Sequence, residues 1–215
     1  THDYPLIKRD LLVFTKCPLC RSKKIIPIAK VFLRSKFNFF STSVCEHCRL
    51  VFRDISPSVN WFKKCWKIIK TVDPQPFNPE TEIIRQKEYT KYLKIVKKYK
   101  SQGNLLDVGA AYGTGAHVLK KGGFQVEAVE PEDNKFIHAR KQFGLKVHAD
   151  SLENLLRKKK LKSKYDVIVF AHCLEHLDNP INVLPALEKL LKKDGILYLE
   201  TPDIYKAVVW SDALF

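Results

Sequence analysis

The second half of the chain alternates short apolar runs with longer segments of helical spacing. Continuous apolar runs bounded by polar residues predict strands that are buried on both faces of a parallel sheet. The predicted strands span residues 105–108, 125–129, 146–148, 166–170 and 196–200. The predicted helices lie between them, at residues 116–121, 133–143, 152–156 and 181–191. This alternation with short connections predicts an α/β fold, a Rossmann-like doubly wound sheet with helices on both faces.

The first half of the chain has a different pattern. Short apolar segments at residues 25–31, 37–44 and 50–52 predict the strands of a small ribbon-like module. A helix is predicted to start after Asn78, because Asn78 suits the N-cap and Pro79 the first helical position. We therefore divide the chain into a ribbon-like module at 1–56, a connector at 57–77 and an α/β domain at 78–215.

The connection after the first strand of the α/β domain carries the strongest chemical signal. Asp107 lies in this strand, and Gly109 and Gly113 follow in the turn that leads to a helix. Glycine accepts a positive φ, and the N–H groups at a helix N-terminus attract a ligand. A dinucleotide-binding fingerprint would need glycines at two positions that hold Ala111 and Thr114. The spacing is instead acid-x-Gly-x-x-x-Gly, which predicts a small-molecule cofactor at this turn.

Polar and small residues follow the other strands at the same edge of the predicted sheet. Glu130 follows the second strand, about 20 residues beyond the turn, where a carboxylate can accept hydrogen bonds from both ribose hydroxyls. Taken alone, Glu130 is also consistent with a solvated acid at a helix entry. Asp150 follows the third strand and Ala171 the fourth, and Asp150 beside Ser151 is equally consistent with N-cap chemistry. Because ligands bind such sheets at the carboxyl ends of the strands, we expect these residues to contact the cofactor.

Two C-x₂-C pairs lie in the N-terminal module. They are Cys17 with Cys20 and Cys45 with Cys48. Two such turns can present four thiolates to one tetrahedral Zn²⁺, and a closed site of this kind is structural. The bound zinc would stabilise a segment too small to fold alone. Two disulfides are the alternative, which a cytoplasmic location disfavours. His47 is an alternative ligand within the second pair.

Composition and charge narrow the class of protein. The chain has 215 residues and 45% hydrophobic content, enough for one sizeable core and a small module. No apolar run approaches the ~20 residues of a membrane-spanning helix, and no signal peptide is visible, so we expect a cytoplasmic protein with no membrane partner. Of the net charge of +15, most lies in residues 1–103, which hold 22 basic and 8 acidic side chains. This asymmetry fits either a polyanion-binding face or a lysine-rich, solvated surface.

Two further segments, with the glycine turn and the cysteine pairs, resemble a known family. Residues 170–180 read Phe-Ala-His-Cys-Leu-Glu-His-Leu-Asp-Asn-Pro, and residues 199–203 read Leu-Glu-Thr-Pro-Asp. The chain resembles class I S-adenosylmethionine (SAM) methyltransferases with an N-terminal zinc-binding domain, among them the sugar C-methyltransferases. The resemblance implies that Asp150 bonds the adenine amino group and that Ala111 replaces a middle glycine. The implied SAM-binding residues are Asp107, Gly109, Ala111, Gly113, Glu130, Asp150 and Ala171.

The resemblance also implies structure beyond the last predicted strand. The sheet of this class normally continues with a helix and an antiparallel hairpin, and family members have a further C-terminal domain. The chain ends at Phe215 and contains no methionine. We therefore expect the C-terminal part of the sheet to be incomplete, and the chain to be truncated or its sequence to lack residues.

Three residues after the fourth strand take their expected roles from the same resemblance. Transfer of a methyl group to a hydroxyl, or to a carbon beside a carbonyl, requires a proton acceptor, and histidine titrates in the right range. In the sugar enzymes, the pair that corresponds to Glu175 and His176 is implicated in catalysis. In ubiquinone-pathway O-methyltransferases a similar segment is linked to a divalent metal. His172, Glu175 and His176 are therefore expected either to form the catalytic group or to bind a metal.

The sequence leaves three functions open. The first is methyl transfer from SAM to carbon or oxygen of a small-molecule acceptor, with nucleotide-linked sugars or other carbohydrates as the expected class. The second is an RNA methyltransferase whose basic N-terminal module binds phosphates. The third is a binding module that keeps the fold without the activity. The sequence does not indicate the oligomeric state of the protein.

Overall fold

The structure is a computed structural model that describes residues 11–32, 39–57, 77–162, 164–177 and 180–202. The chain divides into two compact units, residues 1–76 and 77–215. Most of the predicted connector at 57–77 lies outside the described residues, and so do Asp178, Asn179 and Asp203 of the family-like segments. We describe each unit by itself.

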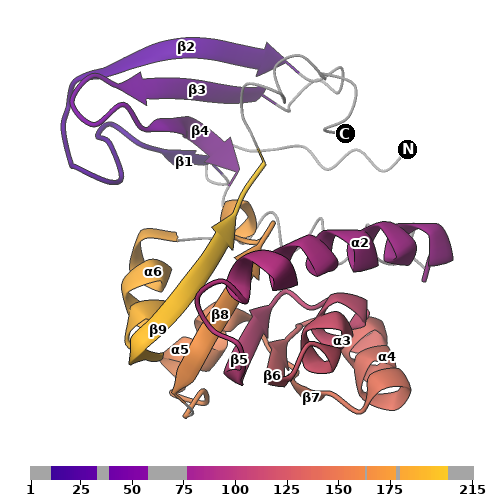
Figure 1. Cartoon of the computed structure of the whole chain (residues 1–215). Coiled ribbons are helices and arrows are strands. Elements are labelled where there is room, and N and C mark those ends of the chain that lie inside the picture. The colour runs from indigo at the N-terminus through magenta and orange to yellow at the C-terminus, as the bar shows by residue number, and fades with distance from the viewer. Residues whose placement is uncertain (1–10, 33–38, 58–76, 163, 178–179, 203–215) are drawn as a thin grey trace. The chain divides into compact units, whose positions relative to one another are not determined.

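The first unit contains a four-stranded antiparallel sheet (Figure 1). Its strands are β1 (Leu11–Val13), β2 (Ile25–Phe32), β3 (Phe39–Cys45) and β4 (Val51–Pro57), in the order β1-β4-β3-β2. Three of them confirm the predicted ribbon strands. The sequence did not predict β1, because three apolar residues are too short a run to separate from a loop. β1 is held by its pairing with the end of β4.

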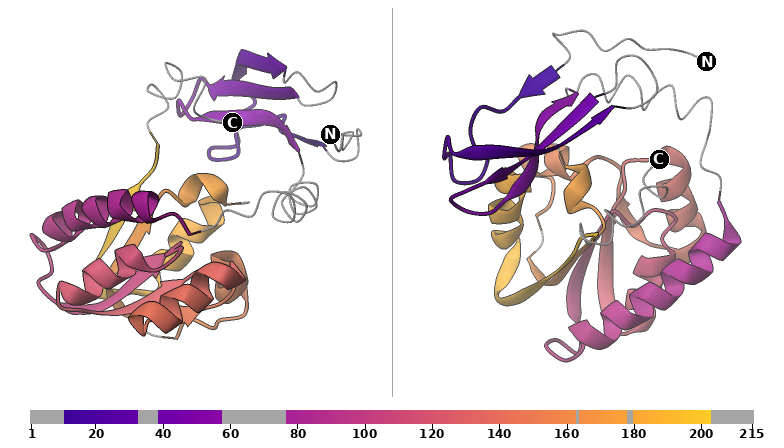
Figure 2. Two further views of the ribbon diagram at one scale, coloured as in Figure 1. Left: turned by 90° about the vertical axis from the view of Figure 1, so that its right-hand side faces the viewer. Right: turned by 90° about the horizontal axis from the view of Figure 1, so that it is seen from above.

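The second unit is a five-stranded parallel sheet with helices on both faces (Figures 1 and 2). Its strands are β5 (Gly103–Val108), β6 (Phe124–Val129), β7 (Lys146–His148), β8 (Tyr165–Ala171) and β9 (Leu191–Glu200). Its α-helices are α2 (Pro79–Val96), α3 (Thr114–Lys121), α4 (Asp133–Phe143), α5 (Leu152–Arg157) and α6 (Pro180–Glu188). The order β7-β6-β5-β8-β9 reverses direction at β5, which confirms the predicted doubly wound α/β fold.

The start of α2 follows from its first residues. The side chain of Asn78 accepts hydrogen bonds from the N–H groups of Glu80 and Thr81 at 2.9 and 3.4 Å. Pro79 occupies the first turn, where its missing N–H is not needed. Glu80 and Glu82 add negative charge at the positive end of the helix. The predicted N-cap is therefore confirmed.

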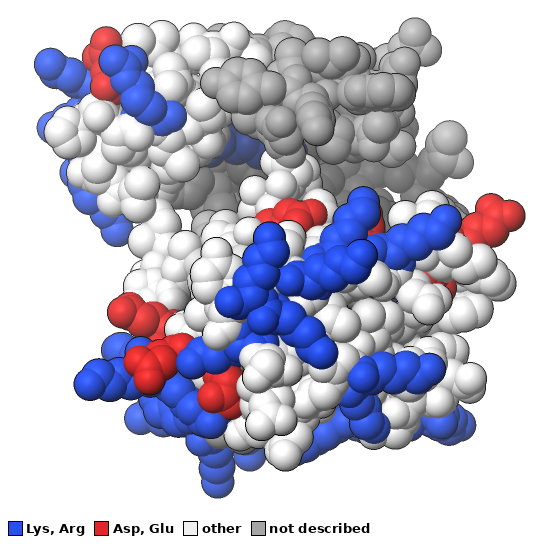
Figure 3. Space-filling view, in the orientation of Figure 1, with Lys and Arg blue, Asp and Glu red and all other residues white. Residues whose placement is uncertain are grey.

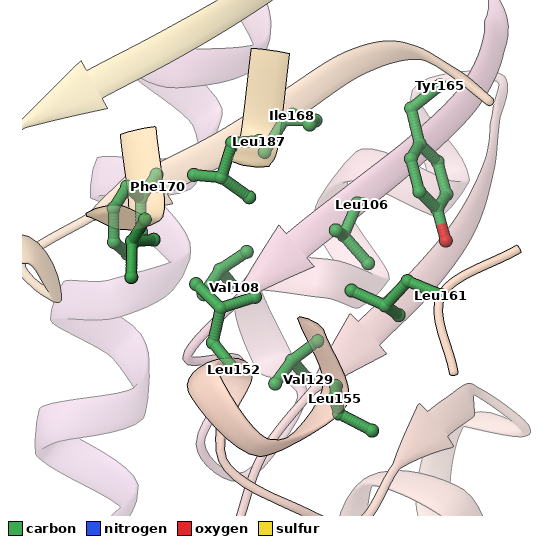
Figure 4. Packing of buried hydrophobic residues seen from close by; sticks show 11 residues of the cluster. Leu106, Val108, Val129, Leu152, Leu155, Leu161, Tyr165, Ile168, Phe170 and Leu187 are labelled. Atoms are coloured by element: carbon green, nitrogen blue, oxygen red, sulfur yellow. The ribbon is translucent and has the colours of Figure 1, made fainter. Parts of the chain in front are cut away.

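Alternate residues of the central strands face opposite sides of the parallel sheet. Leu105 packs in a cluster with residues of α2 and α3, whereas Leu106 packs in a cluster with residues of α5 and α6. Val167 and Ile168 on β8 divide in the same way. Figure 4 shows the second cluster, in which side chains from β5, β6, β8, α5 and α6 meet around Leu106 and Ile168. Because both faces of the central strands are buried, the strands carry consecutive apolar residues, at 105–106 and 167–171, and not an alternating pattern.

The predicted boundary between the last helix and the last strand was wrong. The helix predicted at 181–191 ends at Glu188, and β9 begins at Leu191 and not at residue 196. Leu190 and Leu191 continue the helical spacing, but Leu191 pairs with Tyr165, and the carbonyl of Leu190 accepts a hydrogen bond from the N–H of Tyr165 at 2.9 Å. Sheet pairing therefore decides the end of this helix. None of the helices in the described ranges is long and apolar enough to cross a membrane.

Candidate active site and metal centre

The predicted site residues of the second unit gather at one edge of the parallel sheet. The glycine turn follows β5, Glu130 follows β6, Asp150 lies just beyond β7, and the histidine segment follows β8. The carboxyl ends of parallel strands meet at the same edge, and the strand order reverses at β5. The fold thus brings together residues that are far apart in the sequence.

The turn after β5 has the left-handed backbone that the glycines predicted. Gly109 has φ +80° and Gly113 has φ +89°. A Cβ added at Gly113 would lie 2.6 Å from the Cβ of Ala139 on α4, so the turn also depends on close packing. Ala111, in the middle position, has φ +47°, a conformation that costs a non-glycine residue roughly 1–2 kcal/mol. The turn keeps its shape despite this substitution.

Glu130 is hydrogen-bonded to the backbone of the glycine turn. Its side chain is buried, and one carboxylate oxygen accepts a hydrogen bond from the N–H of Ala111 at 2.8 Å. The other oxygen accepts from the N–H of Glu132 at 2.9 Å. Burial raises the pKa of this carboxyl, while the two N–H groups oppose the rise. Glu130 is therefore a fixed acceptor with a second lone pair on each oxygen, and not a solvated helix-entry acid.

Asp107 lies beneath the turn and is completely buried. Its Oδ1 accepts a hydrogen bond from the hydroxyl of Tyr89 on α2 at 3.0 Å. Its Oδ2 is buried and has no hydrogen-bond partner among the described residues. Burial raises the pKa of Asp107 to about 7, and the positive charge of Arg85 on α2 opposes that rise. A buried acceptor without a partner is costly, so this oxygen suits the N–H group of a ligand.

Asp150 and Ala171 are less available than predicted. The Oδ1 of Asp150 accepts from the N–H of Ser151 and the amide of Asn154, and Oδ2 pairs with Lys158 at 2.9 Å. The bond from Lys158 lowers the pKa of Asp150. Ala171 ends β8 with its side chain in the cluster beneath α2. Both residues therefore have structural partners in addition to their place at the sheet edge.

The histidine segment forms a chain of contacts. His172 has φ +52°, and its Nε2 lies 3.2 Å from Oε1 of Glu200. The Nδ1 of the same ring lies 4.0 Å from Oε1 of Glu175. Glu175 and His176 lie in a short 3₁₀ helix, η2 (Leu174–His176), and the Nε2 of His176 is also 4.0 Å from Oε1 of Glu175. The three predicted catalytic residues are thus neighbours, and the side chain of His176 is the most exposed of them, at 76%.

Sequence reasoning missed Glu200. It ends β9 opposite Ala171 of β8, and its carboxylate accepts hydrogen bonds from the hydroxyls of Tyr92 (at 3.1 Å) and Tyr198. Burial favours the neutral form, but these hydroxyl bonds outweigh it and keep the pKa of Glu200 below its usual value. The available signal was an acid at the end of an apolar strand, in the same position as Glu130 on β6.

The contacts of His172 bear on the alternative of a divalent metal. Its two ring nitrogens face two different carboxylates, one on η2 and one on β9. Across the described parts of the chain, the only close group of three or more potential ligand atoms is that of the four cysteines. Of the three side-chain contacts of the histidine segment, only that of His172 with Glu200 is within hydrogen-bond distance, and the two contacts of Glu175 are longer ion-pair distances.

The four cysteines of the first unit converge on one point. Their sulfur atoms all lie within 4.8 Å of one another. The distance from Sγ of Cys17 to that of Cys48 is 3.5 Å, and so is the distance from Cys20 to Cys45. A disulfide requires about 2.05 Å, whereas the edge of a tetrahedron with metal–sulfur bonds of 2.3 Å is about 3.8 Å. The donor set and its size therefore fit one tetrahedral metal ion.

The two cysteine loops repeat the same backbone geometry. The N–H of Arg21 donates to the carbonyl of Cys17 at 3.0 Å, and the N–H of Arg49 donates to the carbonyl of Cys45 at 2.9 Å. Both arginines have φ +63°. A left-handed backbone is costly for arginine, and it occurs directly after each cysteine pair. The two loops therefore share a geometric requirement. That requirement is the presentation of two sulfurs toward the other loop.

Known proteins with similar sequence or structure define the class of the second unit. A family model described as a methyltransferase domain matches residues 82–211. The chain therefore belongs to the methyltransferase-domain family.

The relatives extend this finding without covering the whole chain. The ubiquinone biosynthesis O-methyltransferase of Actinobacillus pleuropneumoniae serotype 7 (strain AP76) is 30% identical over 105 residues, which are 45% of this chain and 44% of that protein. The enzyme of the same name from Histophilus somni (strain 2336) is 28% identical over 109 residues, 47% of this chain and 45% of that protein. The chain thus spans less than half the length of these curated relatives.

A solved structure shares the fold. The structure of the plantazolicin methyltransferase BpumL in complex with SAH superimposes with a TM-score of 0.50 and 18% sequence identity. The match covers 74% of this chain and 60% of that chain. At this identity the similarity concerns the fold alone, and it agrees with the α/β architecture described above.

Proposed function

We propose that the protein is a SAM-dependent methyltransferase that acts on a small-molecule acceptor. One observation carries the proposal: the buried carboxylate of Glu130 is fixed against the N–H of Ala111 in the glycine turn, where the strand order reverses. Open α/β sheets bind nucleoside ligands at this point. The SAH complex of BpumL, a protein of the same fold, supports SAM as the donor.

Each residue of the turn has a role in the proposed complex. The second lone pairs of Glu130 accept hydrogen bonds from the ribose hydroxyls. The Oδ2 of Asp107, which has no hydrogen-bond partner among the described residues, accepts from an N–H group of the donor. Gly109 and Gly113 let the backbone approach the ligand, and α3 directs its N-terminus toward it. Asp150 contacts the adenine only if the contact coexists with its bonds to Ser151, Asn154 and Lys158.

The bound donor supplies a methyl group on a positively charged sulfur, and sulfur keeps the electron pair when the carbon–sulfur bond breaks. The acceptor atom forms the new bond to the methyl carbon and loses its proton. We assign the removal of this proton to the histidine segment, with His172, Glu175 and His176 at the acceptor side of the site. The ring of His172 is fixed by Glu200, whereas that of His176 is 76% exposed. We therefore assign the proton to His172 and acceptor contacts to His176.

The acceptor class follows from the relatives and the resemblance together. The two curated relatives are O-methyltransferases by name, which supports oxygen as the methylated atom. The first class to test is therefore small molecules with a hydroxyl group, such as phenols. Nucleotide-linked sugars, implied by the sugar C-methyltransferase resemblance, are the second acceptor class to test. In both classes the acceptor atom carries a hydrogen atom that must be removed.

The RNA alternative rested on the positive charge of the first half of the chain. Part of that charge lies on α2 of the methyltransferase unit, where Figure 3 shows Lys and Arg side chains gathered. The exposed lysines of this helix are Lys87, Lys91 and Lys94. Residues 1–76 hold 15 basic and 5 acidic side chains, so most of the basic excess lies in the cysteine-containing unit. Lysine outnumbers arginine 30 to 8 in the chain and is the weaker ligand for phosphate, which favours the solvated-surface explanation.

The four cysteines serve a structural role in this proposal. We infer that they hold one Zn²⁺, because a closed set of four thiolates leaves no coordination position for a substrate. Unpaired thiols are maintained in reducing compartments, so the proposal includes a cytoplasmic location. The cysteine-containing unit is then a zinc-ribbon-like module beside the methyltransferase domain.

A transfer assay with methyl-labelled SAM tests the function. Phenolic compounds and nucleotide sugars are offered in separate pools, with RNA as a third pool. We expect the label in a small molecule, no transfer by His172→Gln, and a raised KM with His176→Ala. Label in the RNA pool alone would replace the proposal by the RNA alternative. The absence of label in every pool, together with no SAM binding, would leave only a binding module.

A further inference from the structure

The end of β9 carries the polar network that holds the ring of His172. Its centre is the carboxylate of Glu200, which ends the strand next to β8. Oε1 accepts a hydrogen bond from Tyr92 on α2 at 3.1 Å and lies 3.2 Å from Nε2 of His172, while Oε2 accepts from Tyr198. Three elements thus converge on one side chain.

The network fixes His172 through its backbone as well as its ring. The N–H of His172 donates to the carbonyl of Glu200 at 2.9 Å, so the residue after β8 is attached to the end of β9. The backbone of His172 has φ +52°, a conformation that non-glycine residues adopt at a cost. Strained residues persist where their surroundings hold them, and they cluster at functional sites. Here the backbone carbonyl and the side-chain carboxylate of Glu200 stabilise this conformation of His172.

The two nitrogens of the His172 ring have unequal surroundings. Nε2 lies within hydrogen-bond distance of Glu200, whereas Nδ1 lies 4.0 Å from the nearest carboxylate oxygen, that of Glu175. A carboxylate accepts a proton donor, so Nε2 carries the hydrogen and Nδ1 keeps its lone pair. The side chain of His172 is 46% exposed, so an acceptor molecule can approach the ring.

We propose that Glu200 is a positioning residue, whose carboxylate holds the Nε2–H of His172 so that Nδ1 receives the proton of the methyl acceptor. This inference rests on the proposed function. The proton moves from the acceptor atom to Nδ1, the acceptor bonds the methyl carbon, and the donor sulfur keeps the pair of the broken carbon–sulfur bond. The carboxylate remains unprotonated and stabilises the imidazolium that forms.

The tyrosines complete this arrangement. Tyr92 is buried, and its ring packs against that of Tyr198 with centroids 4.9 Å apart. Their hydroxyls donate to Glu200 and limit its rotation, so the carboxylate presents Oε1 to the histidine ring. Hydrogen bonds to a charged acceptor also keep it charged. Tyr92 and Tyr198 thus act on Glu200, and Glu200 acts on His172.

Nuclear magnetic resonance of the nitrogen-15-labelled protein tests the inference without a known acceptor. A carboxylate-bonded Nε2–H gives a downfield proton resonance that exchanges slowly with water, and His172→Gln assigns it by loss. We expect this resonance in the wild type and its loss in Glu200→Ala. Tyr198→Phe removes one of the two hydroxyls that limit the rotation of Glu200 and leaves the bond between Glu200 and His172 in place, so the resonance should remain but exchange faster with water.

Two further variants keep every outcome informative. Glu200→Gln has the same size and a neutral acceptor, so we expect an upfield shift of the resonance even if Glu200→Ala does not fold. Glu175→Gln should leave it unchanged. A resonance that is absent from the wild type, that persists in Glu200→Ala, or that depends on Glu175 overturns the inference. Calorimetry with SAM separates this failure from that of the proposed function, because the latter would also abolish donor binding by the wild type.

Discussion

The two units of the chain differ in what their buried residues are. In the first unit, at positions 11–29 and 41–55, the buried side chains are those of Cys17, Ser41, Ser43 and Cys45. The apolar side chains described at these positions are exposed or half-buried, with Leu12 at 41% and Ile28 at 53%. In the second unit, three clusters of buried apolar side chains cover both faces of the sheet. In the proposed account the first sheet depends on its cysteines, whereas the second is held by its hydrophobic core.

This difference explains why the two halves carry different sequence signals. A sheet whose two faces are both covered requires strands with consecutive apolar residues, and these runs can be recognised in the sequence. A sheet organised by four sulfurs requires only correctly spaced cysteines and loops that present them. The comparison predicts that metal removal and core truncation act on different units.

The largest expected effect is that of metal removal on the first unit. Structural zinc contributes about 10–16 kcal/mol in small modules, so chelation or Cys45→Ser should unfold β2, β3 and β4. Hydrogen exchange followed by mass spectrometry would show fast exchange there and unchanged protection in β5 and β8. Metal analysis should find one zinc per chain in the wild type and in the control Cys173→Ser, whose thiol lies outside the cluster. Equal protection with and without metal would contradict the account.

The next effect is a core truncation in the second unit. Leu106 is completely buried between β5 and the helices α5 and α6, so Leu106→Ala should lower the free energy of unfolding of this unit by about 2–5 kcal/mol. The matched variant in the first unit is Leu12→Ala, which should change stability by less than about 0.5 kcal/mol because the side chain is exposed. Denaturant unfolding measures both. Similar losses in the two variants would remove the contrast between the units.

A smaller, pH-dependent effect is expected from Glu127 on β6. Bonds from Lys146, His148 and Tyr165 outweigh burial and lower the pKa of Glu127 to about 2. A carboxyl whose pKa is lower in the folded state stabilises it fully above the unfolded value of about 4.3. That contribution is lost as pH falls from about 4.5 toward 2. The stability difference between the wild type and Glu127→Gln should therefore shrink over this interval, and a constant difference from pH 7 to pH 3 would contradict the assignment.

The sequence predicted most of the fold because its strongest patterns are local or periodic. The strand of residues 146–148 and the helix of residues 133–143 were predicted at their observed bounds. β1 and the start of β9 were not, because both are defined by pairing with distant strands and not by their own apolar pattern. A short stretch of sequence does not contain the distant strand with which it pairs.

The candidate site was predictable where a strand end or a turn sets it. Asp107, Glu130 and the glycines lie together as the motif indicated, and Ala111 has a left-handed backbone like the glycines on either side of it. The role of Glu200 could not be predicted, because its contacts come from Tyr92 and His172, which are far away in sequence. The family-like segment around Glu200 was visible, but its partners were not.

The central claim is that the crevice at the glycine turn binds SAM through Glu130. Isothermal titration calorimetry of the wild type with SAM should give a micromolar dissociation constant. Glu130→Ala should weaken binding at least tenfold, because two hydrogen bonds to a charged acceptor are worth ~3 kcal/mol or more together. Glu127→Gln, on the same strand but away from the turn, should bind as the wild type does. No binding by the wild type, or equal binding by Glu130→Ala, would contradict the account.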